Sequence, residues 1–174
     1  VDSYRGIGIR NSFGITCDPI TGNLWMTDNG PDKFDEINLV DNKFNSGWAK
    51  IVGNINDAQL PLISPYGDFV YSDPEFSFER PVAVTAIEFP DGDSFEKYSD
   101  WLFVGDYNNG RIYKFQLNSD RTGFVFTNPD LSDLVVDYND EITEILFAEI
   151  PGGVTDIEFH NGSLSVVSIF DGII

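Results

Sequence analysis

The feature that most constrains the fold is a pattern of segments that recurs three times along the chain. In each copy an alternating apolar segment is followed by a turn, a second β-rich segment, a polar loop and a third such segment. Ile15, Ile87 and Ile157 occupy matching places in the three copies, 72 and 70 residues apart. Radial repetition of a four-stranded antiparallel sheet is the architecture of a β-propeller. The pattern therefore predicts an all-β fold, a partial β-propeller of about two and a half to three blades.

The individual strands are predicted from alternation and from an abundance of β-branched and aromatic residues. Six segments have this character: 23–27, 36–40, 101–104, 111–115, 154–159 and 164–167. Turn-forming sequences lie between them, at 18–22, 91–92, 109–110 and 160–162. No stretch has a sustained 3.6-residue apolar period. A β-sandwich also uses short strands with frequent turns and is the alternative architecture, but the matching register of three copies favours the propeller.

The spacing of the copies exceeds the roughly 40–50 residues common in propeller repeats, so long connections are expected between them. We expect a blade at 8–51, a long connection at 52–78, a blade at 79–126, a connection at 127–142 and a truncated blade at 143–174. The last blade would contain a polar loop at 170–172 and the start of a strand at 173–174. Neither end of the sequence resembles the end of a complete protein, so the chain is interpreted as a fragment.

The propeller geometry predicts where a site would lie. In an up-and-down blade, the segment entering the first strand and the loop between the second and third strands lie at the same end. For this chain that end collects 9–11, 28–35, 79–81, 106–110 and 151–153. The opposite end collects 18–22, 91–99 and 160–162, the last with His160, the single histidine. A functional site is therefore expected at the first end, near the central axis.

The charge of the chain narrows the range of partners. There are 10 Lys and Arg against 29 Asp and Glu, which gives a formal net charge of −19. Nucleic acid and anionic membrane surfaces would be repelled, whereas divalent cations and neutral ligands are compatible with this charge. No apolar run approaches the roughly 20 residues that a membrane span needs, so membrane insertion is not expected. Cys17 is the single cysteine, which excludes an intrachain disulfide.

The densest group of motifs lies near the N-terminus: Gly8-Ile9-Arg10-Asn11-Ser12-Phe13-Gly14, then Asp28-Asn29-Gly30-Pro31, Asp35-Glu36-Ile37-Asn38-Leu39 and Asn45-Ser46-Gly47-Trp48. In this order and spacing they resemble the glucose/sorbosone dehydrogenase family of soluble quinoproteins. That family consists of six-bladed propellers that bind pyrroloquinoline quinone (PQQ) and calcium. The resemblance is strong over 8–51 and weaker over 83–116 and 152–174.

The resemblance implies roles for five residues. The Arg-Asn pair that lies against the quinone falls on Arg10 and Asn11, and Arg10 would polarise the quinone. The Gly-Pro whose carbonyls hold calcium falls on Gly30 and Pro31. Asn29 takes the place of a polar residue, often Gln, beside the cofactor.

Other positions extend or depart from the family pattern. The acidic pair of the family falls on Asp35 and Glu36, of which Asp35 is a candidate calcium ligand. The base of the enzymes is a His from a blade upstream of this chain, and cofactor-binding Lys and Arg fall on Asn108, Gly153 and Thr155. These departures are typical of a divergent branch of the family.

Each candidate also has a structural interpretation. Arg10 could form an ion pair with Asp35 or Glu36, and the pair Asp35-Glu36 could be a solvated start of a strand. The sequence 29–31 is a turn signal by composition alone. The three tryptophans, Trp25, Trp48 and Trp101, are expected to pack between blades.

Two functions remain open on the sequence. In the first, the chain is part of a PQQ- and calcium-dependent dehydrogenase that oxidises an aldose sugar in the periplasm or outside the cell, and the fragment itself is inactive. In the second, it is a non-catalytic propeller module that binds a protein or a glycan and has lost quinone binding. Half a propeller exposes apolar blade faces, so self-association, for example as a homodimer, is expected in either case.

Overall fold

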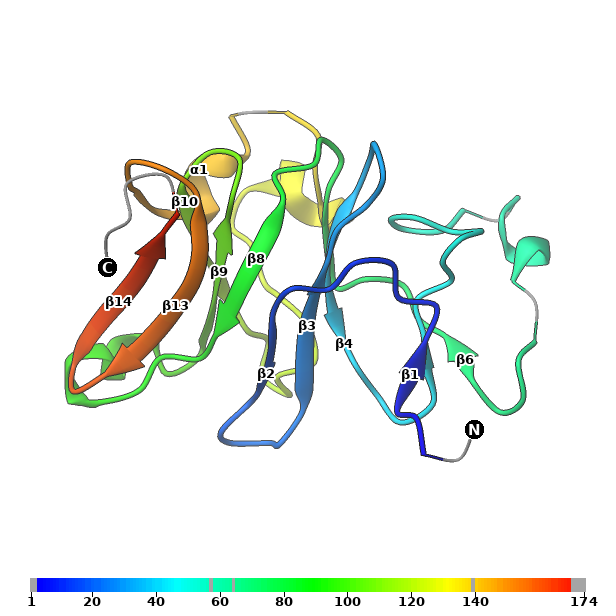
Figure 1. Cartoon of the computed structure of the whole chain (residues 1–174), viewed down its shortest axis with the longest axis horizontal. Coiled ribbons are helices and arrows are strands. Elements are labelled where there is room, and N and C mark those ends of the chain that lie inside the picture. The colour runs from blue at the N-terminus through cyan, green and yellow to red at the C-terminus, as the bar shows by residue number, and fades with distance from the viewer. Residues whose placement is uncertain (1–2, 57, 64, 139, 170–174) are drawn as a thin grey trace.

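The computed structural model describes residues 3–56, 58–63, 65–138 and 140–169 (Figure 1). Three sheets stand side by side, with their strands running in roughly the same direction across the view. A smaller sheet lies beside the first of them. The predicted loop at 170–172 and strand at 173–174 lie outside the described residues.

The first large sheet is built from β2 (Ile15–Cys17), β3 (Leu24–Asp28), β4 (Asp35–Leu39) and β7 (Phe76–Phe78), each antiparallel to its neighbour. β11 (Val135–Val136) adds a fifth strand at the outer edge, parallel to β7. The second sheet has the same plan, with β8 (Val84–Glu88), β9 (Trp101–Asp106), β10 (Arg111–Gln116) and β12 (Leu146–Glu149). The third contains β13 (Val154–His160) and β14 (Ser163–Ser168).

The matching isoleucines confirm the repeat. Ile15, Ile87 and Ile157 all lie in the first strand of their sheets, opposite Met26, Val104 and Val166. The fold is thus all-β, a partial β-propeller with two four-stranded blades and the first two strands of a third within the described residues. One short helix, α1 (Ile142–Ile145), interrupts it.

The predicted boundaries between blades and connections need correction. The outer strand β7 lies inside the expected connection 52–78, and the outer strand β12 lies in the expected third blade at 143–174. The long insertions therefore fall within blades, between the third and fourth strands, and not between blades. A three-residue strand is too short to show alternation, so the sequence pattern does not reveal β7.

The two insertions, here called excursions, have little regular structure. The first contains β5 (Phe44–Asn45), η1 (Leu60–Leu62) and β6 (Val70–Tyr71); β5 lies between β1 (Gly6–Ile7) and β6 in a parallel three-stranded sheet. The second contains η3 (Pro129–Asp133), β11 and α1. A further 3₁₀ segment, η2 (Asp93–Tyr98), connects β8 to β9.

The core lies between the blades. Trp25, Phe76 and Phe115 pack between the first and second sheets, with ring centroids of Phe76 and Phe115 4.8 Å apart. Phe103 and Phe159 pack between the second and third sheets at 5.1 Å. Burial of such rings contributes a large share of the free energy of folding. The expectation that tryptophans pack inside is confirmed for Trp25 and is wrong for Trp48, which is 38% exposed.

Threonine side chains join the blades near the axis. The Thr27 hydroxyl donates to the Thr85 carbonyl at 2.9 Å, and the Thr85 hydroxyl donates to the Val154 carbonyl at 2.7 Å. Gly14 passes so close to the second blade that a Cβ there would lie 2.2 Å from the Thr85 carbonyl oxygen. The first strands of the three blades are therefore fixed in a common arrangement around the axis.

At the end away from the predicted site, a buried ion pair fastens the second excursion to the first blade. Arg121 Nε donates to Asp18 Oδ2 at 2.6 Å, and both side chains are almost fully buried. Burial by itself raises the pKa of Asp18, but the bonds from Arg121, Ile20 and Thr21 outweigh it and leave the pKa below its usual value. His160 lies at this same end, beside Asn161, as predicted.

Glu75 fastens the outer strand of the first blade. Its backbone N–H donates to the Ile37 carbonyl at 3.0 Å, and its carboxylate accepts from the Leu39 N–H. Burial raises the pKa of Glu75 to about 8, and the nearby Asp41 and Asp73 add to the rise. Between its usual pKa and pH 8, the folded chain therefore holds a proton that the unfolded chain has released.

We expect the free energy of unfolding to fall as the pH rises from about 5 to 8, and the substitution Glu75→Gln to remove part of that fall. Gln keeps an acceptor for Leu39 and carries no charge, so the variant should be more stable than the parent by on the order of 2 kcal/mol at pH 8.5 and similar to it at pH 5. Urea unfolding at a series of pH values measures this. Glu96→Gln, at an exposed site on η2, is the control, and parallel profiles for Glu75→Gln and the parent would contradict the prediction.

Candidate functional site

The segment that enters the first blade is tied to the end of β3 by a buried carboxylate. Asp28 is 4% exposed and accepts the N–H of Arg10 at 3.0 Å and the N–H of Asn11 at 2.6 Å. Burial raises the pKa of Asp28, and these backbone bonds work against the rise. Asp28 therefore places Arg10 and Asn11 beside the β3–β4 loop, which confirms the predicted end of the propeller, here called the mouth.

Asp35 connects the same loop to the next blade. It is fully buried, and its two oxygens accept from the Gly30 N–H at 3.0 Å and the Ala83 N–H at 2.6 Å. Burial again raises its pKa. The interpretation of 35–36 as a solvated strand start is wrong, because Asp35 and Glu36 are both buried. Each Asp35 oxygen already serves a backbone N–H, so the geometry supports a positioning role for Asp35 more directly than a role as calcium ligand.

Asn29 offers an unused oxygen at the mouth. Its side-chain N–H groups donate to the Asn11 carbonyl at 3.2 Å and the Val84 carbonyl at 2.8 Å, while its Oδ1 is buried and has no hydrogen-bond partner among the described residues. A buried unsatisfied acceptor is costly and indicates a missing partner. Hard cations such as Ca²⁺ bind amide and backbone oxygens, so Asn29, with the adjacent Gly30 and Pro31 carbonyls, fits calcium. In the described part of the chain, no three His, Cys, Asp or Glu side chains form a metal-binding group.

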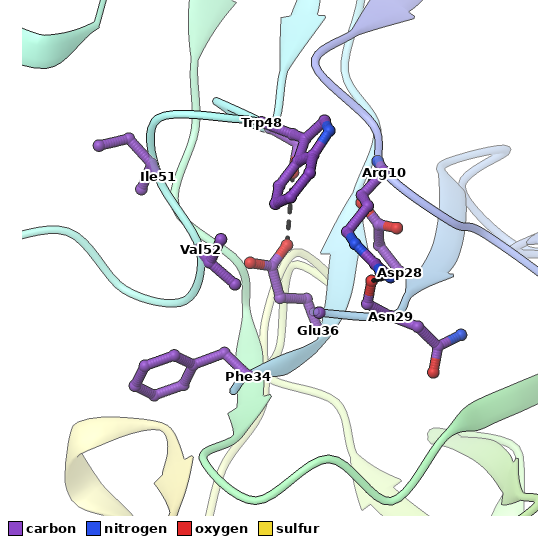
Figure 2. A pocket seen from close by; sticks show the side chains of 10 residues that line it. Arg10, Asp28, Asn29, Phe34, Glu36, Trp48, Ile51 and Val52 are labelled. Carbon is purple, nitrogen blue, oxygen red and sulfur yellow. Dashed lines mark hydrogen bonds between the residues drawn. The ribbon is translucent and has the colours of Figure 1, made fainter. Parts of the chain in front are cut away.

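Arg10 lies across this loop without an ion pair to the acidic residues after it. Its guanidinium donates to the Asn29 carbonyl at 2.8 Å and lies over the Trp48 ring, 5.4 Å from the centroid (Figure 2). The alternative of an ion pair with Asp35 or Glu36 is therefore wrong. The exposed Arg10 remains available to an anionic or polar ligand.

Glu36 lies behind Arg10 in a cavity of about 10 Å³, the size of one water molecule (Figure 2). Its carboxylate accepts from the Gly53 N–H at 2.6 Å, the Asn38 amide at 3.2 Å and the Ser46 hydroxyl at 3.3 Å. Burial raises the pKa of Glu36 to about 7, with a further contribution from the charge of Asp28. The motifs 35–39 and 45–48 contain Glu36, Asn38 and Ser46, but their sequence does not predict that the first excursion brings Ser46 and the Gly53 N–H onto the Glu36 carboxylate.

A groove of about 480 Å³ opens at the mouth between the three blades. Arg10, Asn11, Asn29 and Gly30 line it from the first blade. The other walls include Ala83, Thr85, Tyr107, Thr155 and Ile169. The sequence places the segment 106–110 at this end without marking Tyr107 as a site residue, and Thr85 carries no motif of its own; both residues reach the groove through the repeat.

The charge in this mouth groove is one-sided. Arg10 is the single cationic side chain among its described lining residues. Thr155 lines the wall where the resemblance places a cofactor-binding basic residue in the enzymes, and Asn108 donates to the Pro81 carbonyl at 3.3 Å. The first-blade side of the groove therefore offers one cation, Arg10, close to the fully buried Asp35, and the opposite side has no cation among its described lining residues.

Repeated four-stranded blades arranged around an axis, with a groove at one end, define the class of the fold as a β-propeller. The sequence matches the glucose/sorbosone dehydrogenase family over residues 4–135, and the chain belongs to that family.

The chain is also similar to individual proteins of known function. Aldose sugar dehydrogenase YliI of Escherichia coli is 28% identical over 116 residues, which cover 66% of this chain and 31% of that protein. The PQQ-bound aldose sugar dehydrogenase of Streptomyces coelicolor superposes with a TM-score of 0.62 at 16% identity, over 94% of this chain and 39% of that one. A calcium structure of the Trichoderma reesei family AA12 enzyme gives 0.66 at 16% identity, over 97% and 51%. The chain thus spans about a third of the curated relative's length.

We expect Asp35→Asn to weaken the connection between the β3–β4 loop and the second blade. Asn has one acceptor oxygen, so either the Gly30 or the Ala83 N–H would face an NH₂ group, and the free energy of unfolding should fall by about 2 kcal/mol. Urea unfolding measures the loss, and amide exchange at Gly30 and Ala83 should become faster. Asp32→Asn, at an exposed site in the same loop, is the matched control; equal stability of the two variants would show that Asp35 does not hold the loop.

Proposed function

We propose that this chain is the part of a PQQ- and calcium-dependent aldose sugar dehydrogenase that forms the first-blade side of the cofactor site. The observation that carries the proposal is the convergence of Arg10, Asn11 and Asn29 on one groove, with a buried Asn29 oxygen that lacks a partner. Membership of the family and the names of its relatives support the same function. The family also favours a periplasmic or extracellular location.

Each residue has a distinct task in this proposal. Arg10 would bind and polarise the quinone carbonyls by charge-assisted hydrogen bonds, and Asn11 would bind a polar edge of the same ring system. Asn29 Oδ1 with the Gly30 and Pro31 carbonyls would hold calcium, which fits oxygen donors of this kind. When bound, PQQ would supply the two-electron acceptor for the hydride that leaves the sugar. Asp28 and Asp35 keep these groups in position through backbone hydrogen bonds.

The sequence has one histidine, and it is not placed to take the proton-abstracting role of the family's histidine. This residue, His160, lies at the end away from the mouth. We therefore propose that the 174 residues alone do not turn over substrate. None of the described residues forms a helix long and apolar enough to cross a membrane. We propose a small sugar as the partner, and neither a lipid surface nor nucleic acid.

A second function, a non-catalytic propeller module that binds a protein or a glycan, is favoured by one observation. The second- and third-blade walls of the mouth groove offer Thr85, Tyr107 and Thr155 but no cation among the described residues. A cofactor with several carboxylates would lack charge neutralisation on that side.

A titration of PQQ into the chain, with and without Ca²⁺, separates these functions. We expect a change in the PQQ absorption spectrum that requires Ca²⁺, an at least tenfold weaker affinity for Arg10→Ala, and no dye-linked oxidation of glucose by the chain alone. Lys33→Ala, which removes a surface charge paired with Glu79 at 2.9 Å, is the control. No spectral change at saturating PQQ would favour the binding module, and robust oxidation would disprove the predicted inactivity.

We also propose that the isolated chain self-associates through the open face of its first blade. Ile15 is 64% exposed, whereas the matching Ile87 and Ile157 are 4% and 3% exposed, and Phe13 beside it is 68% exposed. An apolar strand position of this kind is normally covered by a neighbouring sheet. In a dimer with a two-fold axis, the first blade of each copy would cover the open face of the first blade of the other.

Light scattering with size-exclusion chromatography is expected to show a dimer, and Ile15→Glu to shift it to the monomer. Val125→Glu, at a 44% exposed site on the second excursion, should leave the dimer intact. A parent chain that is monomeric at high concentration would contradict the proposal.

A further inference from the structure

A second hollow, of about 180 Å³, lies between the first two blades and the second excursion. The segment 80–82, which connects the two blades, lines it together with Asn109 and Arg111 of the second blade and the segment 136–138 of the excursion. It is separate from the mouth groove, with which it shares the lining residue Pro81. We call this region the arginine hollow.

The arginine hollow gathers cations in an acidic chain. The sequence has five arginines, and two of them, Arg80 and Arg111, line this hollow. Arg111 Nε donates to Glu149 Oε1 at 2.7 Å, which uses one of the several N–H donors of its guanidinium. No hydrogen bond or ion pair joins the Arg80 side chain to another described residue. Two guanidinium groups at one hollow fit a carboxylate, which accepts several charge-assisted hydrogen bonds.

The wall formed by the excursion adds a carboxylate to the same hollow. Asp137 lines it and forms no ion pair with Arg80 or Arg111. Asp137 is also part of an acidic surface with four other carboxylates: Asp130, Asp133, Asp140 and Glu141. Partial burial and the nearby charge of Glu141 raise the pKa of Asp137. A positive group on the ligand would therefore be stabilised at this wall, whereas a simple anion would be repelled by it.

The remainder of the arginine hollow is apolar and small. Phe78, Val82, Val136 and Ile142 line it, and all four are buried side chains of the core. Its volume of about 180 Å³ corresponds to about six water molecules of the liquid. Pockets for drug-sized ligands are larger, roughly 300–1,000 Å³. The hollow therefore fits a small molecule that has an apolar part.

Hydrogen bonds hold the walls of the hollow in place. The Asn109 backbone N–H donates to Asp106 Oδ1 at 2.6 Å, and its side-chain N–H donates to Asp106 Oδ2 at 3.2 Å. On the excursion, Glu141 Oε2 accepts from the Asp137 N–H at 2.9 Å and the Tyr138 N–H at 3.0 Å. Asp106 and Glu141 are both buried. Walls that are formed before the ligand arrives lower the entropic cost of binding.

We propose that the arginine hollow binds a small zwitterion, an α-amino acid with an apolar side chain. Arg80 and Arg111 would bind its carboxylate, Asp137 would bind its ammonium group, and its side chain would pack against the apolar wall. A zwitterion has no net charge, so the net charge of −19 on the chain does not repel it. This inference goes beyond the proposed function and requires neither PQQ nor calcium.

The test is a calorimetric titration of the chain with three ligands that share one carbon skeleton. L-Leucine carries both charges, 4-methylpentanoate lacks the ammonium group, and 3-methylbutylamine lacks the carboxylate. We expect leucine to bind about tenfold more tightly than either analogue, because each of them loses one charge-assisted contact. Two-dimensional NMR should show shifts of the Asn109 and Tyr138 amide signals when leucine is added.

Two variants assign the two charges of the ligand. Arg80→Ala should weaken the binding of leucine and 4-methylpentanoate about fivefold and leave 3-methylbutylamine unchanged. Asp137→Asn should weaken the binding of leucine and 3-methylbutylamine by a similar factor without weakening that of 4-methylpentanoate. Lys50→Ala and Asp120→Asn, at exposed sites outside the hollow, are the matched controls. Arg80 is exposed and Asp137 is half-buried, so neither substitution removes a core contact.

The outcomes separate this proposal from the proposed function. Equal affinities for leucine and 4-methylpentanoate would overturn the zwitterion, and so would leucine binding that Arg80→Ala leaves unchanged. Absence of leucine binding at millimolar concentration would overturn the site as a whole. The three-ligand comparison on the parent chain decides the matter even if a variant fails to fold. A failure to bind PQQ leaves this proposal intact, and a failure to bind leucine leaves the proposed function intact.

Discussion

The structure of the mouth depends on buried carboxylates that bind backbone N–H groups in place of cations. Asp28, Asp35 and Asp106 are each almost fully buried, and each accepts at least one backbone N–H at 2.6 Å. Burial raises the pKa of all three, so each needs these bonds to carry its charge. In a chain with so few basic residues, the backbone is the available source of positive dipoles.

These hydrogen bonds between buried carboxylates and the backbone determine which polar groups remain free to bind a ligand. Since Asp28 and Asp35 use their oxygens on the backbone, neither needs Arg10 as a partner, and the guanidinium is held by the Asn29 carbonyl and the Trp48 ring. The side-chain N–H groups of Asn29 donate to two carbonyls, and its Oδ1 has no partner among the described residues. Among the described residues that line the mouth groove, Arg10 is therefore the one cation, and Asn29 Oδ1 is an unused oxygen. Backbone hydrogen bonds position both residues, and the charge of Arg10 also favours the ionised form of Asp28.

Much of this fold could be predicted from the sequence, and the limits have physical causes. The three inner strands of each full blade are five or six residues long, apart from β2, and their alternation and the isoleucine register were readable. The outer strands β7 and β12 are three and four residues long and follow excursions, so periodicity could not reveal them. The motifs located Arg10 and Asn29. The burial of Asp35 could not be foreseen, because its partner Ala83 lies 48 residues away and offers a backbone N–H that has no signature.

The three isoleucines show why composition alone is a poor guide to packing in a repeated fold. Their sequence environments match, yet Ile87 and Ile157 are covered by a preceding blade while Ile15 is open. Trp48 is a second example. A tryptophan is expected to pack between blades, but the first excursion holds the Trp48 ring at the surface, against Arg10. In both cases the burial of an apolar side chain depends on which sheet or segment packs against it, and this depends on the topology of the chain. An exposed apolar residue in such a fold is therefore informative when the matching residues of the other repeats are buried.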